Sequence, residues 1–310
     1  MTRSVTVRVP AKVNAQLAVG APRPDGFHDL ANVFLAVGLY DEVTVTPAER
    51  LTVTCSGPDA AQVPLDATNL AARAAIALAE RYGLAPDVHI HIAKDIPVAG
   101  GMAGGSADGA AALLACDALW STGATREELL ALCAELGSDV PFSLVGGAAL
   151  GVGRGEQLTP IEVGGTFHWV FAVADGGLST PAVYGEFDRL SAGTDVPEPT
   201  ASAPLLAALR AGDTGALADA LSNDLQAAAL SLRPSLADTL AAGTAAGALA
   251  TLVSGSGPTT AFLVADEESA QKVAQALVTS GTCRTARAAV SPAPGARVLN
   301  RKGPPGPDRP

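Results

Sequence analysis

The sequence has little positive charge, few aromatic residues and no long apolar run. Lysine occurs only at Lys12, Lys94, Lys272 and Lys302, and the formal net charge at pH 7 is −11. Because duplex nucleic acid is bound by Lys and Arg that neutralise its phosphates, this balance argues against a nucleic-acid partner. No apolar run approaches the roughly 20 residues that span a bilayer, and the first residues lack a secretory hydrophobic core. We therefore expect a cytoplasmic protein without a membrane partner.

Cysteine is scarce as well, and the four cysteines are widely separated: Cys55, Cys116, Cys133 and Cys283. Zinc sites and redox dithiols need closely spaced pairs, which this sequence does not contain. We expect reduced thiols, which agrees with a cytoplasmic location.

The chain is rich in apolar residues and long enough for two domains. It has 310 residues, of which 48% are hydrophobic and 16% are charged, so each half can bury its own core. Alternation of polar and apolar residues over 4–20 and 41–57 predicts antiparallel strands. Helical spacing over 66–83 predicts a helix that ends at Gly83, and 87–97 predicts a further strand.

A glycine-rich loop follows that strand. Residues 97–109 read PVAGGMAGGSADG, directly before a helix expected to reach about Trp120. The order strand, glycine loop, helix points backbone amides at an anion, and Ser106 offers a hydroxyl where the helix is expected to begin. The loop is neither a Walker A sequence nor a GxGxxG fingerprint. It also contains no lysine, so the positive charge that an anion needs must come from elsewhere.

The second half predicts one strand, a helix, two strands around a glycine turn, a helix and a final strand. This is the element order of a split βαβ sandwich. The expected domains are 1–162 and 163–298, and composition predicts a disordered tail over 299–310.

Three further segments carry candidate functional residues. Residues 10–14 read PAKVN and place Lys12 and Asn14 on one side of a strand, Asp139 follows a helix end in GSDVPF, and 253–262 form a glycine turn. Taken alone, each has an ordinary explanation as a solvated lysine, a helix cap or a hairpin.

In order and spacing, these motifs and the glycine loop resemble those of the GHMP small-molecule kinases. The similarity runs from about residue 5 to residue 295, and PRPDGFHDL, with Phe27 and His28, narrows it to kinases of a cytidine diphosphate-linked methylerythritol. The resemblance implies an α+β, two-domain GHMP kinase fold. Its N-terminal domain would resemble ribosomal protein S5 domain 2, and its C-terminal domain would be a ferredoxin-like split βαβ unit.

The resemblance also implies the reaction and its cofactors. A hydroxyl of the substrate would be phosphorylated by ATP, with Mg²⁺, to give the 2-phosphate in non-mevalonate isoprenoid biosynthesis. Lys12 would supply the charge that the loop lacks, and Asp139 would be the catalytic base, an effect of about 10² to 10⁴ in rate. Ser106 is the candidate Mg²⁺ ligand. The implied ATP-binding residues are Pro97, Val98, Ala99, Gly100, Gly101, Met102, Ala103, Gly104, Gly105, Ser106 and Ala107.

Five residues are implied to bind the small-molecule substrate. Asn14 would lie beside its reacting end, and His28 would hydrogen-bond the cytosine. Phe27 stands where the family commonly has a tyrosine stacked on the base, Tyr184 matches the aromatic on the opposite face, and Thr180 lies at a contacting position. We expect a monomer or a weak homodimer.

Three other functions remain open from the sequence. A GHMP kinase for homoserine or mevalonate would share the loop, Lys12 and Asp139, but would not need the base-binding residues. A dinucleotide-dependent oxidoreductase could use GVGRGE at 151–156, although the third glycine of the fingerprint is lacking. A non-catalytic nucleotide sensor would bind ATP without turnover.

Overall fold

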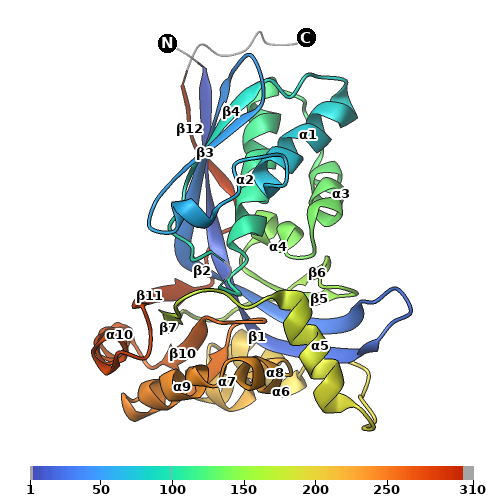
Figure 1. The fold of residues 1–310 in the computed structure, drawn as a ribbon. Helices are drawn as coiled ribbons and strands as arrows, with labels where there is room; N and C mark the ends of the chain where they lie inside the picture. Colours follow the sequence, from blue (N-terminus) through green and yellow to red (C-terminus); the bar gives the residue numbers. More distant parts are fainter. Residues whose placement is uncertain (1–2, 99, 303–310) are drawn as a thin grey trace.

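The computed structural model describes residues 3–98 and 100–302, which form two β-sheets and the helices that cover them (Figure 1). The strands of the larger sheet are β1 (Ser4–Pro22), β2 (His28–Pro47), β3 (Thr52–Ser56), β4 (Val88–Ala93), β5 (Ala148–Val152), β6 (Gln157–Pro160), β8 (Ser222–Asn223) and β12 (Arg297–Lys302). Their main order is β12-β1-β2-β4-β3, with β5 and β6 continuing from β2 and β8 pairing with β1. Strand β3 pairs in parallel with β4 and not with β2. The prediction of antiparallel pairing is therefore wrong for this part of the sheet.

A long hairpin of β1 and β2 runs through both halves of the molecule (Figure 1). The alternating Val5, Val7 and Val9 are fully buried, which agrees with the predicted period of two. At the tip of the hairpin, Gly26 adopts a φ of 81°, a conformation that is costly for residues with a Cβ. The hairpin therefore carries Lys12 in its middle and Phe27 at its tip.

Four helices cover one face of this sheet: α1 (Leu70–Tyr82), α2 (Gly104–Trp120), α3 (Arg126–Leu136) and α4 (Val140–Val145). The 3₁₀ turn η1 (Ala60–Gln62) precedes them. Helix α1 begins after Asn69, whose side chain accepts a hydrogen bond from the Ala71 amide, and ends at Gly83 in the left-handed conformation. Helix α3 ends before Gly137. The predicted end at Gly83 is therefore confirmed.

The start of α2 differs from the prediction. Ala103, at a φ of 59°, precedes the first helical residue and makes no side-chain cap. Ser106 is the third residue of the helix and not its cap, because the chain turns into the helix at the glycine loop. The first intrahelical bond runs from the Ala107 amide to the Ala103 carbonyl, which leaves the amides of residues 104–106 free for other partners.

The second sheet is four-stranded and antiparallel: β7 (Phe167–Val173), β9 (Ala250–Val253), β10 (Thr260–Val264) and β11 (Thr285–Ser291). Its order is β11-β7-β10-β9. The helices of this half are α5 (Thr180–Ser191), α6 (Ala203–Ala211), α7 (Thr214–Ala220), α8 (Gln226–Leu232), α9 (Ser235–Ala245) and α10 (Glu267–Ser280). The strand, helix, strand, strand, helix, strand order confirms the predicted split βαβ unit.

The C-terminal prediction is partly wrong. Residues 299–302 belong to β12, which pairs with the edge of β1 in the larger sheet; residues 303–310 lie outside the described residues. The chain thus returns to the first half after completing the second, and the boundaries 1–162 and 163–298 remain a prediction. No helix within the described ranges combines the length and apolarity needed to cross a membrane.

Candidate active site

A cavity of about 740 Å³ lies where the hairpin, the glycine loop, the start of α4, helix α5 and the β9–β10 turn meet. Most of the residues predicted for the site line it: Lys12, Asn14, Phe27, His28, Gly100, Gly101, Ala103, Gly104, Gly105, Ser106, Asp139, Thr180 and Tyr184. Segments far apart in the sequence therefore contribute to one site.

Lys12 lies at the centre of this cavity and is almost fully buried. Its Nζ atom donates hydrogen bonds to Asn14 Oδ1 at 2.7 Å and to the Gly101 carbonyl at 2.9 Å. Burial lowers the pKa of Lys12 below its ordinary value, and the carboxylate of Asp139 opposes that shift. The ammonium thus joins the first strand to the glycine loop, as the lack of a lysine in the loop requires.

Asp139 precedes α4 but does not cap it. Its side chain makes no capping hydrogen bond, and its Oδ2 atom lies 3.8 Å from Lys12 Nζ. The carboxylate is one-third exposed, so a ligand can reach it. The ordinary interpretation of this aspartate as a helix cap is therefore wrong.

The glycine loop approaches other backbone too closely for larger residues. A Cβ on Gly101, whose φ is 74°, would lie 2.0 Å from the Ser254 carbonyl oxygen, so glycine is required there. The amides at the start of α2 carry about half a positive charge from the helix dipole and line the cavity at Gly104, Gly105 and Ser106. Backbone amides and Lys12 together can hold a phosphate.

A buried ionic cluster lies behind the loop. Lys94 donates hydrogen bonds to Asp41 and to Asp108, and a Cβ on Gly104 would lie 2.9 Å from the Lys94 Nζ atom. Burial alone would lower the pKa of Lys94, but the carboxylates of Asp108 and Asp41 outweigh it and raise that pKa. Burial also raises the pKa of Asp108. The cluster ties strand β2 to both ends of the loop, because Asp41 also accepts from the amides of residues 95 and 96.

The turn between β9 and β10 closes the site from the second sheet. The Ser254 hydroxyl donates to the Gly101 carbonyl, and a Cβ on Gly255 would lie 3.2 Å from both Lys12 Nζ and Asn14 Oδ1. The Ser256 hydroxyl pairs with that of Thr180 at 2.9 Å. This turn is therefore more than a hairpin connection, because it is hydrogen-bonded to the glycine loop and to Thr180.

The other end of the cavity is aromatic. The rings of His28 and Tyr184 lie 5.1 Å apart, while Phe27 is 49% exposed and the Arg154 guanidinium lies 4.9 Å above its ring. Burial raises the pKa of Tyr184, and the charge of Asp139 adds to the shift, so the phenol stays neutral. The exposed Phe27 ring and the partly buried Tyr184 ring, beside a polar imidazole, suit a nucleobase.

Four residues of the predicted phosphate loop do not line the cavity. The side chain of Met102 is fully buried in the core, and Ala107 lies inside α2. Pro97 and Val98 precede the part of the loop that reaches the cavity. Ala99 lies outside the described residues.

The structure adds four polar residues that the sequence did not single out. Asn32 accepts a hydrogen bond from Asn14, Asp188 pairs with His28, and Asn223 donates to the Gly255 carbonyl. Arg154, the fourth, lies in the GVGRGE segment, which joins β5 to β6 with no helix after it. The dinucleotide interpretation of that segment is therefore wrong.

The side chains of the described residues do not by themselves form a metal site. Among residues 3–98 and 100–302, no group of three or more His, Cys, Asp or Glu side chains could hold a metal ion. The buried Cys116 and Cys133 are free thiols, and burial raises the pKa of Cys133 to about 12.

Known proteins are similar to this chain along nearly its whole length. The models for the GHMP kinase N-terminal and C-terminal domains match residues 69–147 and 205–282. A 4-diphosphocytidyl-2-C-methyl-D-erythritol kinase of Streptomyces avermitilis is 80% identical, with 96% of this chain and all of the relative covered.

Solved structures show the same architecture. A crystal structure of 4-(cytidine 5'-diphospho)-2C-methyl-D-erythritol kinase has a TM-score of 0.76 at 32% identity, covering 93% of this chain and 99% of that one. A homoserine kinase of Cytophaga hutchinsonii has a TM-score of 0.74 at 22% identity, covering 96% and 97%, so that likeness is one of fold. By sequence and architecture, the chain belongs to the 4-diphosphocytidyl-2-C-methyl-D-erythritol kinases of the GHMP kinase family.

Proposed function

We propose that this enzyme transfers the γ-phosphoryl group of ATP to a hydroxyl of 4-diphosphocytidyl-2-C-methyl-D-erythritol and so forms its 2-phosphate. One observation carries the proposal. The Lys12 ammonium, the Asp139 carboxylate 3.8 Å away and the glycine-lined amides all face one cavity. A weakly nucleophilic alcohol and a phosphoryl donor need these three kinds of group in one place.

Phosphate binding would use the loop and Lys12. The amides of residues 104–106 have no intrahelical partner, so they are available to phosphate oxygens. Lys12 would offset the charge on the transferring group. Its position is fixed by Asn14 and Gly101, which limits the motion of the ammonium before reaction.

Asp139 would act on the acceptor hydroxyl. As the new bond between the hydroxyl oxygen and the γ-phosphorus forms, the hydroxyl proton passes to the carboxylate. The bond between the γ-phosphorus and the oxygen bridging to the β-phosphate breaks, and ADP leaves with that electron pair. Most of the remaining rate enhancement would come from positioning and electrostatic stabilisation.

The aromatic end would hold the cytidine. Phe27 would stack on one face of the base and Tyr184 on the other, with His28 bonded to the edge of the ring. Thr180 and Asn14 would contact the rest of the substrate. Phenylalanine in place of the family's usual tyrosine keeps the stacking face and loses only a hydroxyl.

Mg²⁺ would accompany the ATP. Mg²⁺ binds few protein ligands and keeps several waters when it coordinates phosphate oxygens, which fits a site without a carboxylate cluster. The Ser106 hydroxyl lines the cavity at the start of α2 and is the candidate ligand. The ion would neutralise part of the phosphate charge.

The aromatic end also favours this substrate over those of related kinases. Homoserine and mevalonate contain no ring that would need Phe27, His28 and Tyr184. The predicted cytoplasmic location, the absence of a nucleic-acid partner and the monomer or weak homodimer remain predictions alongside this proposal.

An ATP-dependent assay tests the proposal. The protein is incubated with Mg-ATP and the cytidyl compound, ADP release is followed, and the product mass is measured. We expect ADP and a product heavier by one phosphoryl group, with no turnover of homoserine or mevalonate. Turnover of either of those alone would contradict the proposal, and ATP binding without turnover would indicate a nucleotide sensor.

A further inference from the structure

A carboxylate on α5 contacts the imidazole at the base end of the cavity. Asp188 Oδ1 lies 2.9 Å from His28 Nε2, and both residues line the cavity. The side chain of His28 is 5% exposed and that of Asp188 is 37% exposed. The imidazole is therefore buried, whereas the carboxylate that contacts it is partly exposed to solvent.

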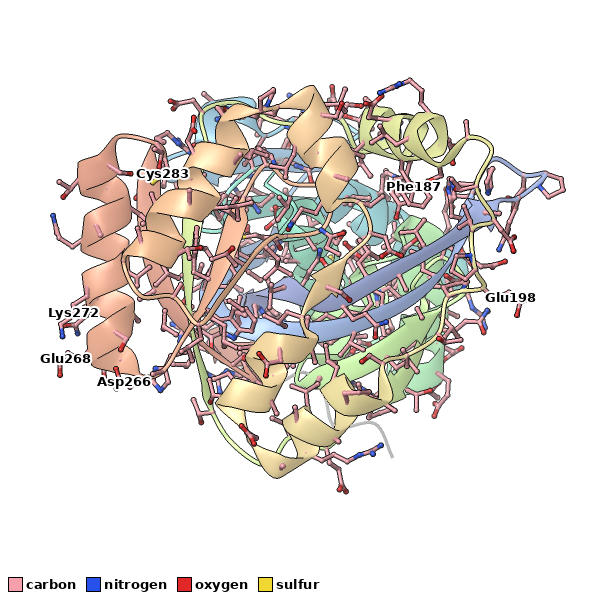
Figure 2. All side chains as sticks on the ribbon, turned by 90° about the horizontal axis from the view of Figure 1, so that it is seen from below. Phe187, Glu198, Asp266, Glu268, Lys272 and Cys283 are labelled. Carbon is pink, nitrogen blue, oxygen red and sulfur yellow. The ribbon has the colours of Figure 1, made fainter. Side chains whose placement is uncertain are left out.

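Three side chains from one side of helix α5 contact the His28 imidazole. Tyr184, Phe187 and Asp188 follow the three- and four-residue spacing that brings side chains to the same side of a helix. The Tyr184 ring is tilted against the imidazole, and the Phe187 ring lies nearly perpendicular to it with the two ring centres 6.0 Å apart. Figure 2 shows Phe187 on α5 at the end of the molecule where the hairpin lies, while Lys272 and Glu268 on α10 occupy the opposite edge. The ring of His28 thus has little freedom to flip.

The carboxylate determines which nitrogen of His28 carries the proton. An ionised carboxylate only accepts hydrogen bonds, so Nε2 must donate to Asp188. In the neutral ring the other nitrogen, Nδ1, then lacks a proton and can only accept. The hydrogen bond of one nitrogen thereby sets the role of the other.

Nδ1 remains available to a ligand. Within residues 3–98 and 100–302, Nδ1 makes no hydrogen bond. It is also not one of the fully buried polar atoms that lack a hydrogen-bond partner, so solvent or a ligand can reach it. Because Nε2 is occupied by Asp188, Nδ1 is the imidazole atom that a base in the cavity would meet.

We propose that Asp188 is a positioning residue that makes His28 select cytosine over uracil. This inference rests on the proposed function. The exocyclic amino group of cytosine donates hydrogen bonds, whereas uracil has an accepting carbonyl oxygen at the same position. An Nδ1 atom that only accepts pairs with the amino group and repels the carbonyl. Asp188 thus sets the specificity through His28, without touching the base itself.

Three variants test the proposal. Asp188→Ala removes the acceptor and leaves either nitrogen free to carry the proton. Asp188→Asn keeps the shape, but its amide can accept from one tautomer or donate to the other. Asp195→Ala is the matched control, because Asp195 is an exposed aspartate in the segment after α5 that does not line the cavity.

The main readout is kcat/KM for the cytidyl substrate divided by kcat/KM for its uridyl counterpart. Loss of one charge-assisted hydrogen bond corresponds to roughly tenfold or more, so this ratio should fall by about that factor in Asp188→Ala and by less in Asp188→Asn. The KM for ATP should stay unchanged in both variants, and Asp195→Ala should behave as wild type.

The tautomer can be observed directly. In protein labelled with ¹⁵N-histidine, wild-type His28 should show an unprotonated Nδ1 and a protonated Nε2, and Asp188→Asn should shift towards a mixture. His28 is identified as the signal that a His28→Gln variant loses.

Two results would overturn the inference. One is an unchanged substrate ratio in both Asp188 variants, and the other is a wild-type His28 that carries its neutral-state proton on Nδ1. An equal rise in KM for the cytidyl and uridyl substrates is a case of the first result, because it leaves their ratio unchanged. It would mean that Asp188 only holds α5 against the hairpin. A wild-type enzyme that phosphorylates neither compound would instead refute the proposed function itself.

Discussion

Replacing Asp139 with asparagine separates the chemical role of the carboxylate from its structural role. The substitution keeps the size of the side chain and removes its charge. The Asp139 side chain makes no capping hydrogen bond, and its one charged contact among the described residues is to Lys12 at 3.8 Å, where the carboxylate is one-third exposed. The carboxylate is partly solvated and lies beyond hydrogen-bond distance of the buried Lys12 ammonium, so we expect a loss of stability of about 1 kcal/mol.

The expected effect on catalysis is larger. Removing a general base lowers the rate by at least about a hundredfold, which corresponds to about 2.7 kcal/mol of activation free energy. Because this exceeds the cost to folding, the variant should stay folded at assay temperature while kcat falls. Lys12 keeps its bonds to Asn14 and Gly101, so ATP should still bind.

The assay is steady-state ADP release with the cytidyl substrate, accompanied by thermal unfolding and by titration with each ligand. Asp195→Asn, at an exposed position away from the cavity, controls for the loss of one negative charge. Turnover within a few fold of wild type would remove Asp139 as the base. A loss of activity that parallels unfolding would mean that the carboxylate is structural.

Three further predictions concern the base, the loop and acid stability. His28→Ala should raise KM for the cytidyl substrate and spare KM for ATP, and equal rises would contradict base recognition. Gly101→Ala should lower Tm and raise KM for ATP at least about tenfold, because the new Cβ would lie 2.0 Å from the Ser254 carbonyl oxygen. The control is Gly123→Ala, at a similar φ in open space, which should lower the free energy of unfolding by only about 1 kcal/mol. Equal losses of stability in the two variants would show that the contact with Ser254 is not the cause. Arg284 holds the pKa of Asp59 below its ordinary value, so the pair stabilises the fold above pH about 3.9 and this contribution is lost as the pH falls through the lower folded-state pKa. In Asp59→Asn, Tm should therefore depend less on pH in acid, and an unchanged dependence would exclude the pair as its source.

Local chemistry was enough to predict many of the element boundaries. Gly83 ends α1 in the left-handed conformation, which few other residues adopt without strain. Alternating aliphatic residues identified the buried faces of β1 (Val5, Val7 and Val9) and of β4 (Val88, Ile90 and Ile92). These signals depend on neighbouring residues, so the sequence alone contains them.

Other features depend on contacts between distant segments and were missed. The start of α2 was predicted at a Ser106 cap, but the loop is fixed by contacts of Gly101 with Lys12 and Ser254. The proline- and glycine-rich end of the chain concealed β12, which is stabilised by pairing with β1. Asp188 has no local signal, because its contact with His28 forms only where α5 meets the hairpin.

The central claim is that Lys12, Asp139 and the glycine loop serve one phosphoryl transfer. A crystal structure with a non-hydrolysable ATP analogue and the cytidyl substrate tests it most directly. We expect a γ-phosphate oxygen within about 3.2 Å of Lys12 Nζ and the acceptor hydroxyl within the same distance of the Asp139 carboxylate. A γ-phosphate bound away from both side chains, with the substrate still in the aromatic end, would contradict it.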